Sequence, residues 1–449
     1  MHIILLSGGS GKRLWPLSND TRSKQFIKIF KRPENSAPLG RDEDTGYESM
    51  VQRVYRQIRT VDPDATVTIA TSKSQVSSIH NQLGDGVSIS VEPCRRDTFP
   101  AIALATAYLH DVLNVPSEEA VVVCPVDPYV EDSYFKYLDE MCHTAEQKGG
   151  LVLMGINPTF PTEKYGYILP HEDEDGSSHF EFKEKPDAET AKKYIEEGCL
   201  WNGGVFAYRL SYVLEKSREL IGTSSYYELY ANYDKLKKIS FDYAVVENES
   251  HLSIIRYYGE WKDLGTWNTL TEAMEESSVG DVRMNDKCDN VHAINEMGVP
   301  MLVMGCQNIV ISASPEGILV SDMEQSSYIK PFVDDIKQRI MFAEKSWGRY
   351  RVLDVGENSM TVKVTLNAGH KMNYHSHEKR DEIWTVISGS GRTIVDGMEQ
   401  PVKPGDVVTM AAGCKHTVIA GNKGLQMIEV QLGKDISVSD KKKYEFPYK

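Results

Sequence analysis

The chain has 449 residues, of which 41% are hydrophobic and 26% are charged, and its formal net charge is −15. This composition is typical of a folded protein of two or three domains, and it excludes a disordered chain; the acidic balance argues against a nucleic-acid partner. No apolar run is long enough to span a bilayer or to form a signal peptide, so we expect no membrane partner and a cytoplasmic location. The seven cysteines are scattered without a Cys-x-x-Cys pair, which is typical of reduced thiols.

The first part of the chain predicts strands that alternate with helices. Apolar and β-branched runs predict strands at residues 2–6, 66–70, 88–91, 120–124 and 151–155. Longer runs between these strands predict helices at 48–59, 100–113 and 132–148. This order indicates an α/β, Rossmann-like fold with a mostly parallel sheet and helices on both faces. In such sheets the ligand lies beyond the carboxyl ends of the strands.

The pattern changes after about residue 276. Short β-like runs, divided by Gly, Asn, Asp and Pro, lie at 301–304, 308–311 and 318–320. They predict a small β-rich segment resembling a few coils of a β-helix. A connecting helix is expected over 331–344, and strands and turns from residue 347 onward predict a β-barrel domain. We therefore expect domains at 1–278, 279–335 (with the linker) and 336–449.

A glycine-rich loop follows the first predicted strand. Its glycines are Gly8, Gly9 and Gly11, and Lys12 and Arg13 follow them. Such a loop lets the backbone approach a ligand closely and point N–H groups at phosphate oxygens. Between residues 12 and 32 there are seven Lys or Arg and one acidic residue, which in an acidic protein indicates a small polyanionic ligand. The spacing matches neither the P-loop nor the G-x-G-x-x-G motif. The alternative to a phosphate-binding loop is a glycine-rich turn beside a solvated basic face.

Eight segments in chain order resemble one known family. The first reads GGSGKRLWPLS from residue 8, followed by KQF from residue 24, and is similar to the signature of sugar-nucleotide pyrophosphorylases. The other segments lie at 92–102, 125–127, 165–168, 182–186, 201–206, 241–245 and 261–267. Together they cover residues 1 to about 275, and they resemble the bacterial mannose-1-phosphate guanylyltransferases most closely. Pro128 stands where that family has a histidine.

The resemblance implies that GTP and mannose 1-phosphate react to give GDP-mannose and pyrophosphate with Mg²⁺ as cofactor. Joining two anions depends on positioning and charge neutralisation. Arg13 and Lys24 are therefore the expected catalytic cations for the triphosphate, and Lys185 is the expected contact to the sugar phosphate. Asp127 and Asp263 are expected to hold Mg²⁺, since this ion is held by one or two carboxylates with phosphate oxygens. The alternative interpretation of each aspartate is a turn-forming residue.

The resemblance also implies residues that bind the nucleotide or the sugar without taking part in the reaction. The expected nucleotide-binding residues are Leu6, Gly8, Gly9, Gly11, Arg13 and Lys24. The expected substrate-binding residues are Glu92, Gly166, Glu184, Lys185 and Asn202. Leaving a buried polar group unpaired costs about 1–3 kcal/mol, so such contacts discriminate between epimeric sugars. The preference for guanine rests on the resemblance alone.

The C-terminal domain carries a second pattern. His375 and His377 are separated by one residue, so on a strand both side chains point to the same face. Glu382 and His416 complete a set of four candidate ligands. The spacing resembles the first cupin motif. Three histidines and one glutamate suit a divalent transition metal such as Zn, Mn, Fe or Co. The end of the domain resembles type II phosphomannose isomerases, which supply mannose 6-phosphate from fructose 6-phosphate.

The sequence therefore predicts a Mg²⁺-dependent mannose-1-phosphate guanylyltransferase that forms a homo-oligomer, a dimer. Three alternatives stay open. The same fold accepts another nucleotide or sugar 1-phosphate, or the chain is a bifunctional mannose-6-phosphate isomerase and guanylyltransferase. The third alternative is a sugar-phosphate-binding regulator without transferase activity. In a chain without isomerase activity, the cupin domain would serve dimer contacts or sensing.

Overall fold

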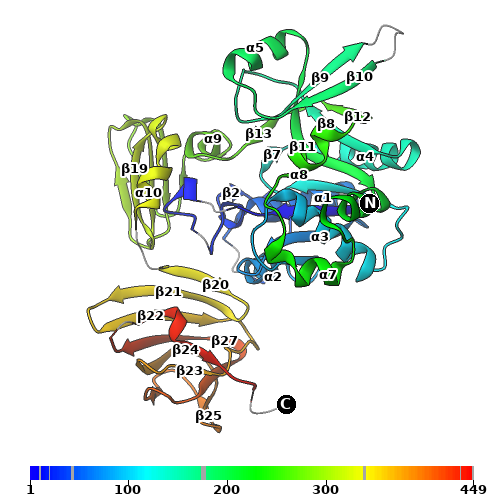
Figure 1. The fold of residues 1–449 in the computed structure, drawn as a ribbon. Helices are drawn as coiled ribbons and strands as arrows, with labels where there is room; N and C mark the ends of the chain where they lie inside the picture. Colours follow the sequence, from blue (N-terminus) through cyan, green and yellow to red (C-terminus); the bar gives the residue numbers. More distant parts are fainter. Residues whose placement is uncertain are drawn as a thin grey trace.

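The structure, a computed structural model, describes residues 1–9, 12–19, 21–41, 45–172, 178–336, 340–434 and 436–446. An α/β part forms the N-terminal half (Figure 1). A small β-rich segment, coloured yellow-green, packs beside it, and a C-terminal body of strands lies below both. None of the helices described is long and apolar enough to cross a membrane.

A nine-stranded sheet organises the α/β part. Its parallel core, in the order β6-β1-β4-β5, consists of β6 (Ala120–Pro125), β1 (His2–Ser7), β4 (Thr66–Ser72) and β5 (Ser88–Glu92). Beyond β6 lie β11 (Leu200–Arg209), β8 (Leu151–Ile156) and β12 (Leu252–Tyr257), and the start of β11 also pairs with the hairpin of β9 (Tyr167–Glu172) and β10 (Ser178–Lys183). The predicted α/β fold with a mostly parallel sheet is confirmed, with β11 antiparallel to β6 and β8.

Helices cover both faces of this sheet. In β1, Ile3 and Leu5 pack into one buried cluster and Ile4 into the other, as the alternation of side chains on a strand requires. The first cluster is covered by α1 (Met50–Val61), α2 (Val76–Leu83) and α4 (Tyr134–Lys148). The second is covered by α3 (Thr98–Asp111), α6 (Leu210–Ile221), α7 (Tyr226–Ala231) and α8 (Phe241–Ala244). The three predicted helices correspond to α1, α3 and α4 within two residues at each end.

Several short elements complete the α/β part. Helix α5 (Ala188–Glu196) contacts strand β9, and α9 (Trp267–Thr271) begins at the last residue of the segment 261–267. Two antiparallel pairs lie outside the main sheet, namely β2 (Phe30–Lys31) with β3 (Tyr47–Glu48) and β7 (Pro128–Val130) with β13 (Trp261–Asp263).

The β-rich segment contains two small sheets. One has the order β14 (Ser278–Val279), β16 (Asp289–Asn295), β18 (Gln307–Ser314) and β19 (Gly317–Asp322), and the other pairs β15 (Val282–Met284) with β17 (Met301–Val303). All these pairs are parallel except the hairpin of β18 and β19. Ile294 and Val310 share a buried cluster with Leu14, Leu17 and Trp267, so the segment and the α/β part have a common core.

The helix expected over residues 331–344 is wrong for most of its length. Helix α10 covers only Lys330–Asp334, with Pro331 in its first turn, and Phe342–Lys345 forms strand β20. Strand β20 pairs antiparallel with β21 (Gly348–Val355), which comes later in the chain. This non-local pairing overrides the local preference from which a helix was predicted.

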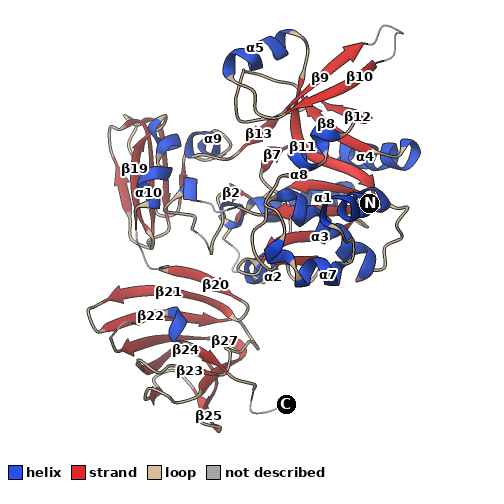
Figure 2. Ribbon diagram, viewed as in Figure 1, coloured by secondary structure: helices blue, strands red, loops and turns tan. Residues whose placement is uncertain are grey.

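The C-terminal domain consists mainly of strands, drawn in red in Figure 2, and they pair antiparallel. After β20 and β21 it contains β22 (Ser359–Leu366), β23 (His375–Ser376), β24 (Asp381–Val395), β25 (Met398–Val402), β26 (Val407–Met410), β27 (His416–Leu432) and β28 (Lys442–Lys443). The long strands β24 and β27 pair along most of their length, with two irregularities in register that bend them. Trp347 and Trp384 are buried in its core.

Candidate active site

A cavity of about 280 Å³ opens at the carboxyl end of β1. Its lining residues are Gly8, Gly9, Lys12, Arg13, Leu14, Lys24, Gln25, Asp127, Gly265 and Lys330. Gly9 has φ +114°, a conformation that favours glycine and turns the chain out of the strand. Leu6 lies in β1, where its carbonyl accepts a hydrogen bond from the Val126 N–H at 3.3 Å, and the predicted Gly11 lies outside the described residues.

The structure brings Asp127 and Asp263 to the same ammonium group. Lys24 Nζ lies 2.8 Å from Asp127 Oδ2 and 3.8 Å from Asp263 Oδ1. Asp127 precedes β7 directly, and β7 pairs with β13 so that Pro128 lies opposite Asp263. Pairing of these two short strands therefore places two carboxylates, far apart in the sequence, at one end of the sheet.

Asp127 and Asp263 shift the pKa of Lys24, and Lys24 and Asp127 shift that of Asp263. Burial opposes the positive charge of Lys24, but the carboxylates of Asp127 and Asp263 outweigh it and raise the pKa of Lys24. Burial also raises the pKa of Asp263, against the attraction of Lys24 and with the repulsion of Asp127. Two carboxylates thus share one largely buried ammonium, and Arg13 lies close enough to act on both Lys24 and Asp263.

A second polar cluster is built from β11, α8 and two loops. Asn202 Nδ2 donates to Asp242 Oδ1 at 2.7 Å, and the Asn202 backbone N–H donates to the Gly166 carbonyl at 2.8 Å. The Glu184 carboxylate is buried and accepts a hydrogen bond from Lys185. A Cβ on Gly166 would lie 2.7 Å from Glu184 Oε2, so any other residue here would have to displace the Glu184 side chain. Four predicted sugar-binding residues, Gly166, Glu184, Lys185 and Asn202, are therefore neighbours.

Aromatic rings connect this cluster to the aspartate pair. Tyr165, beside Gly166, lies edge-on to Trp261 with ring centroids 5.5 Å apart, and Trp261 is in the same short strand as Asp263. The Tyr165 ring also lies 5.1 Å from that of Trp201, next to Asn202. The two polar regions are thus joined by one aromatic wall.

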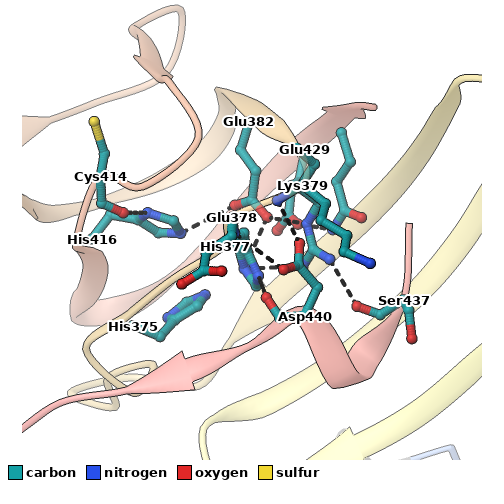
Figure 3. A network of polar contacts seen from close by, with 12 residues as sticks. His375, His377, Glu378, Lys379, Glu382, Cys414, His416, Glu429, Ser437 and Asp440 are labelled. Carbon is teal, nitrogen blue, oxygen red and sulfur yellow. Dashed lines mark hydrogen bonds and ion pairs between the residues drawn. The ribbon is translucent and has the colours of Figure 1, made fainter. Parts of the chain in front are cut away.

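The four predicted metal ligands of the C-terminal domain lie together. One ligand atom from each of His375, His377, Glu382 and His416 falls within 4.8 Å of the others, and all four side chains are buried. Figure 3 shows them converging from neighbouring strands. His375 and His416 lie opposite each other where β23 pairs with β27, and Glu382 comes from β24. The tetrad, as we call these four residues, agrees with the spacing seen in the sequence.

Two known protein families match different parts of the chain. The nucleotidyl transferase family model matches residues 2–41 and 42–278, and the cupin domain model matches residues 362–430. The chain belongs to the nucleotidyl transferase family. It is therefore a nucleotidyltransferase whose C-terminal part carries a cupin domain, and the resemblance found in the sequence is confirmed.

Relatives of this nucleotidyltransferase extend over its whole length. It is 28% identical to the xanthan biosynthesis protein XanB of Xanthomonas campestris pv. campestris strain B100, over 99% of this chain and 98% of that protein. It is 27% identical to a mannose-1-phosphate guanylyltransferase of Salmonella montevideo, over 97% of each chain. A solved structure from Thermus thermophilus, named mannose-1-phosphate geranyltransferase, has a TM-score of 0.61 and 26% identity, covering 74% of this chain and 98% of that one.

The cupin tetrad of this nucleotidyltransferase has the chemistry of a metal site. The Nδ1 atoms of His375, His377 and His416 face backbone carbonyl oxygens at 2.6, 2.7 and 3.0 Å. Donation to these oxygens leaves a lone pair on each Nε2, and that of His377 is engaged by Arg380 Nη2 at 2.9 Å. His416 Nε2 and Glu382 Oε2 are buried without a hydrogen-bond partner and lie 3.2 Å apart. Burial also lowers the pKa of His377 to about 4, so this ring is neutral, as a metal ligand must be. These residues fit a divalent cation.

Further charged side chains surround the tetrad. Arg380 Nε donates to Glu382 Oε1 at 2.9 Å, and its Nη2 donates to His377 Nε2 at 2.9 Å. Glu429 and Lys441 are close by; burial, with the repulsion of Glu382, raises the pKa of Glu429 to about 8, and burial lowers that of Lys441 to about 8. The carbonyl of Asp440 faces His377 Nδ1, so the C-terminal segment supports a ligand of the tetrad (Figure 3).

Sequence reasoning assigned no role to three residues at these sites. Asp242 lies in a matched segment, 241–245, but only its contact with Asn202 shows that it belongs to the second polar cluster. Arg95 Nη2 donates to the Gly9 carbonyl at 3.3 Å and adds a cation beside the glycine loop. The sequence signal for this role is the pair of adjacent arginines, Arg95 and Arg96. Lys330 carries no signal in the sequence, because it reaches the cavity only through the packing of the β-rich segment.

Glu92 lies apart from the other predicted substrate contacts. Its buried carboxylate accepts a hydrogen bond from Tyr233 Oη at 2.6 Å. Burial raises the pKa of Glu92. Its predicted contact with the ribose or the sugar stays a prediction.

Asp242 makes the stability of the protein depend on pH. Burial raises the pKa of Asp242 to about 6, and the nearby Glu184 carboxylate adds to the rise. A carboxyl group that is less acidic in the folded state favours folding below its unfolded pKa of about 4, and this contribution is lost as the pH rises through about 6. The variant Asp242→Asn is therefore expected to unfold with a larger free energy than the wild type at pH 8, by up to about 3 kcal/mol.

Denaturant unfolding of both proteins at pH 8 and pH 5 measures this difference. The gain of Asp242→Asn is expected to shrink at pH 5, where the wild-type carboxyl group is largely protonated. The exposed Asp64→Asn is the matched control, and no gain is expected for it. A gain of equal size for Asp242→Asn at both pH values would contradict the prediction.

Proposed function

We propose that this nucleotidyltransferase is a mannose-1-phosphate guanylyltransferase, which converts GTP and mannose 1-phosphate into GDP-mannose and pyrophosphate. Relatives with this name match nearly the whole chain, including that of Salmonella montevideo. The observation that carries the proposal is the cavity beyond β1, where a glycine loop, Arg13 and Lys24 face a pair of aspartates. A regulator with an inactive site has no need of this arrangement.

The mechanism follows from these positions. The glycine loop with Arg13 and Lys24 binds the triphosphate, and these cations neutralise the charge that develops on the departing pyrophosphate. Asp127 and Asp263 would hold Mg²⁺, which would supply positive charge for the reacting phosphates. Lys24 then exchanges its contact with Asp127 for one with a phosphate oxygen. Because both reactants are anions, this neutralisation is what allows them to meet.

The second polar cluster is proposed to bind the sugar phosphate. Lys185, which is about half exposed, contacts the phosphate. Glu184 and Asp242 accept hydrogen bonds from sugar hydroxyls, and Asn202 donates to them or accepts from them. The aromatic wall of Tyr165 and Trp261 directs the sugar toward the aspartate pair. Orientation of this kind supplies much of the rate of a reaction between two bound substrates.

Release of pyrophosphate tests the proposal. The purified protein is incubated with Mg²⁺, each of the four nucleoside triphosphates in turn, and mannose 1-phosphate, glucose 1-phosphate or galactose 1-phosphate. We expect the largest kcat/KM for GTP with mannose 1-phosphate. A larger value for another pair would assign the same fold to a different sugar nucleotide, and no release with any pair would contradict the proposed activity.

A second activity, mannose-6-phosphate isomerase, is proposed for the cupin domain. The observation that favours it is the charged group around the tetrad, since isomerisation needs a base, and a phosphate needs cations. Arg380 and Lys441 are the candidate cations and Glu429 is the candidate base. The tetrad would hold a divalent transition metal such as Zn, Mn, Fe or Co. Formation of mannose 6-phosphate from fructose 6-phosphate, with and without added metal, tests this activity separately from the first.

We further propose that the protein works as a homodimer in the cytosol. The cysteines are all free, which fits a reducing compartment. Light scattering during gel filtration is expected to give twice the chain mass of 50.6 kDa. A mass of one chain would contradict the dimer.

A further inference from the structure

The nucleotide cavity is built from two parts of the chain. Nearly all of its lining comes from the α/β part, but Lys330 comes from α10, which follows the β-rich segment. Helix α10 packs against the turn at Lys12–Leu14, the first turn after the glycine loop. One wall of the cavity is therefore supplied from outside the segment that the family signature covers.

We call residues 8–26, which carry the first family segment, the signature loop. The β-rich segment and α10 contact the side of this loop that faces away from the cavity, through several polar contacts. Arg22 forms a two-point ion pair with Glu296 at 2.7 and 2.9 Å, and both side chains are largely buried. The Ser314 hydroxyl donates to the Pro16 carbonyl at 2.7 Å, and Lys12 Nζ lies 2.9 Å from Asp334 Oδ1 of α10. Contacts of this kind, together with the shared buried cluster, give Lys330 a fixed position beside the loop.

The charges that line the cavity are strongly unequal. The cations are Lys12, Arg13, Lys24 and Lys330, whereas Asp127 is the one carboxylate among the described lining residues. Lys24 is paired with Asp127 and Lys12 with Asp334. Lys330 is exposed on the cavity wall and forms no ion pair with a carboxylate of the described ranges. The carboxylate of Asp334, four residues further along α10, attracts Lys330 but is itself held by Lys12 at 2.9 Å. A basic side chain in this position is available for an anionic ligand.

We infer that Lys330 is a triphosphate-binding residue of the nucleotidyltransferase site, supplied by α10. The inference rests on the proposed function, because it places the nucleotide in this cavity. The α-phosphorus reacts, so it belongs beside the aspartate pair, and the remaining phosphates extend along the wall formed by Lys12 and Lys330. Lys330 thus binds the part of the nucleotide that leaves as pyrophosphate, as a flexible point charge.

Direct binding measurements separate this role from a structural one. Calorimetry gives the dissociation constants of GTP, pyrophosphate and GMP for the wild type, Lys330→Ala, Lys330→Arg and Lys287→Ala. Lys287 is the control, since it is an exposed lysine of the neighbouring β-rich segment that does not line the cavity. We expect Lys330→Ala to weaken the binding of GTP and pyrophosphate roughly tenfold, while GMP is unchanged. Lys330→Arg retains most of the affinity, and Lys287→Ala behaves as the wild type.

Steady-state kinetics give a second readout. In Lys330→Ala the KM for GTP is expected to rise roughly tenfold, whereas the KM for mannose 1-phosphate stays the same. Equal affinity of Lys330→Ala and wild type for GTP would overturn the inference and leave the proposed function intact. An equal loss for GTP and GMP would also overturn it, because that pattern indicates a distorted site. If the wild type binds neither GTP nor pyrophosphate, the proposed function fails and the inference fails with it.

Discussion

Replacing Asp127 by asparagine is expected to lower kcat for pyrophosphate release by about a thousandfold. The change keeps the shape of the side chain and removes one negative charge. Asp127 accepts the closest contact of Lys24, at 2.8 Å, and forms half of the aspartate pair. Without it the pair no longer attracts a divalent cation strongly, and Lys24 loses the partner that orients it.

Two comparisons make this prediction specific. The equivalent change Asp263→Asn is expected to have an effect of similar size, because the two aspartates share one ammonium. The surface variant Asp64→Asn serves as the control and is expected to turn over normally. Near-normal turnover in Asp127→Asn would show that this aspartate is a turn-former only, and the assignment of the metal ligands would be wrong.

Replacing Glu382 by glutamine is expected to have two large effects on the cupin domain. The affinity for Co²⁺ or Zn²⁺ falls by at least about a hundredfold, because the one anionic ligand of the tetrad becomes neutral. The metal-free protein also loses about 3–5 kcal/mol of stability. The second effect arises because Arg380, which is buried, loses the carboxylate that it contacts at 2.9 Å.

His416→Gln separates these two effects. It removes a ligand of the tetrad but leaves the contact between Arg380 and Glu382 in place. We therefore expect weak metal binding and a metal-free melting temperature close to that of the wild type. Calorimetric titration with metal and thermal unfolding in the presence of a chelator give both quantities. Unchanged metal affinity in Glu382→Gln would contradict the proposed ligand set.

Residues close together in the sequence could be placed before the structure was known. The glycine loop follows an apolar strand, and the pair His375 and His377 follows the period of a strand, so both features are local. Helices α1, α3 and α4 were predicted within two residues at each end because each carries a clear apolar pattern. The order of the matched segments then indicated the family.

What the sequence did not reveal depends on contacts between distant residues. Nothing in the spacing of Asp127 and Asp263 shows that β7 pairs with β13 and brings them to one lysine. Strand β20 was expected to be helical, because its pairing with β21 is not visible in its own four residues. Lys330 joins the cavity only because a common core attaches the β-rich segment to the signature loop.

The signature loop has two faces with different tasks. Its inner face presents glycines and cations to the cavity, and its outer face packs against the β-rich segment through Arg22 and Pro16. A loop that must approach phosphates closely cannot fill its own core, so the second segment stabilises it from behind. This division explains why the proposed nucleotide site includes a part of the chain that lies outside the family signature.

A crystal structure with a non-hydrolysable GTP analogue and mannose 1-phosphate tests the central claim most directly. The phosphates of the nucleotide are expected against Gly8, Gly9 and Arg13, with the sugar phosphate beside Lys185 and Asn202. A nucleotide bound away from the end of β1, or a sugar phosphate found only in the cupin domain, would contradict the account.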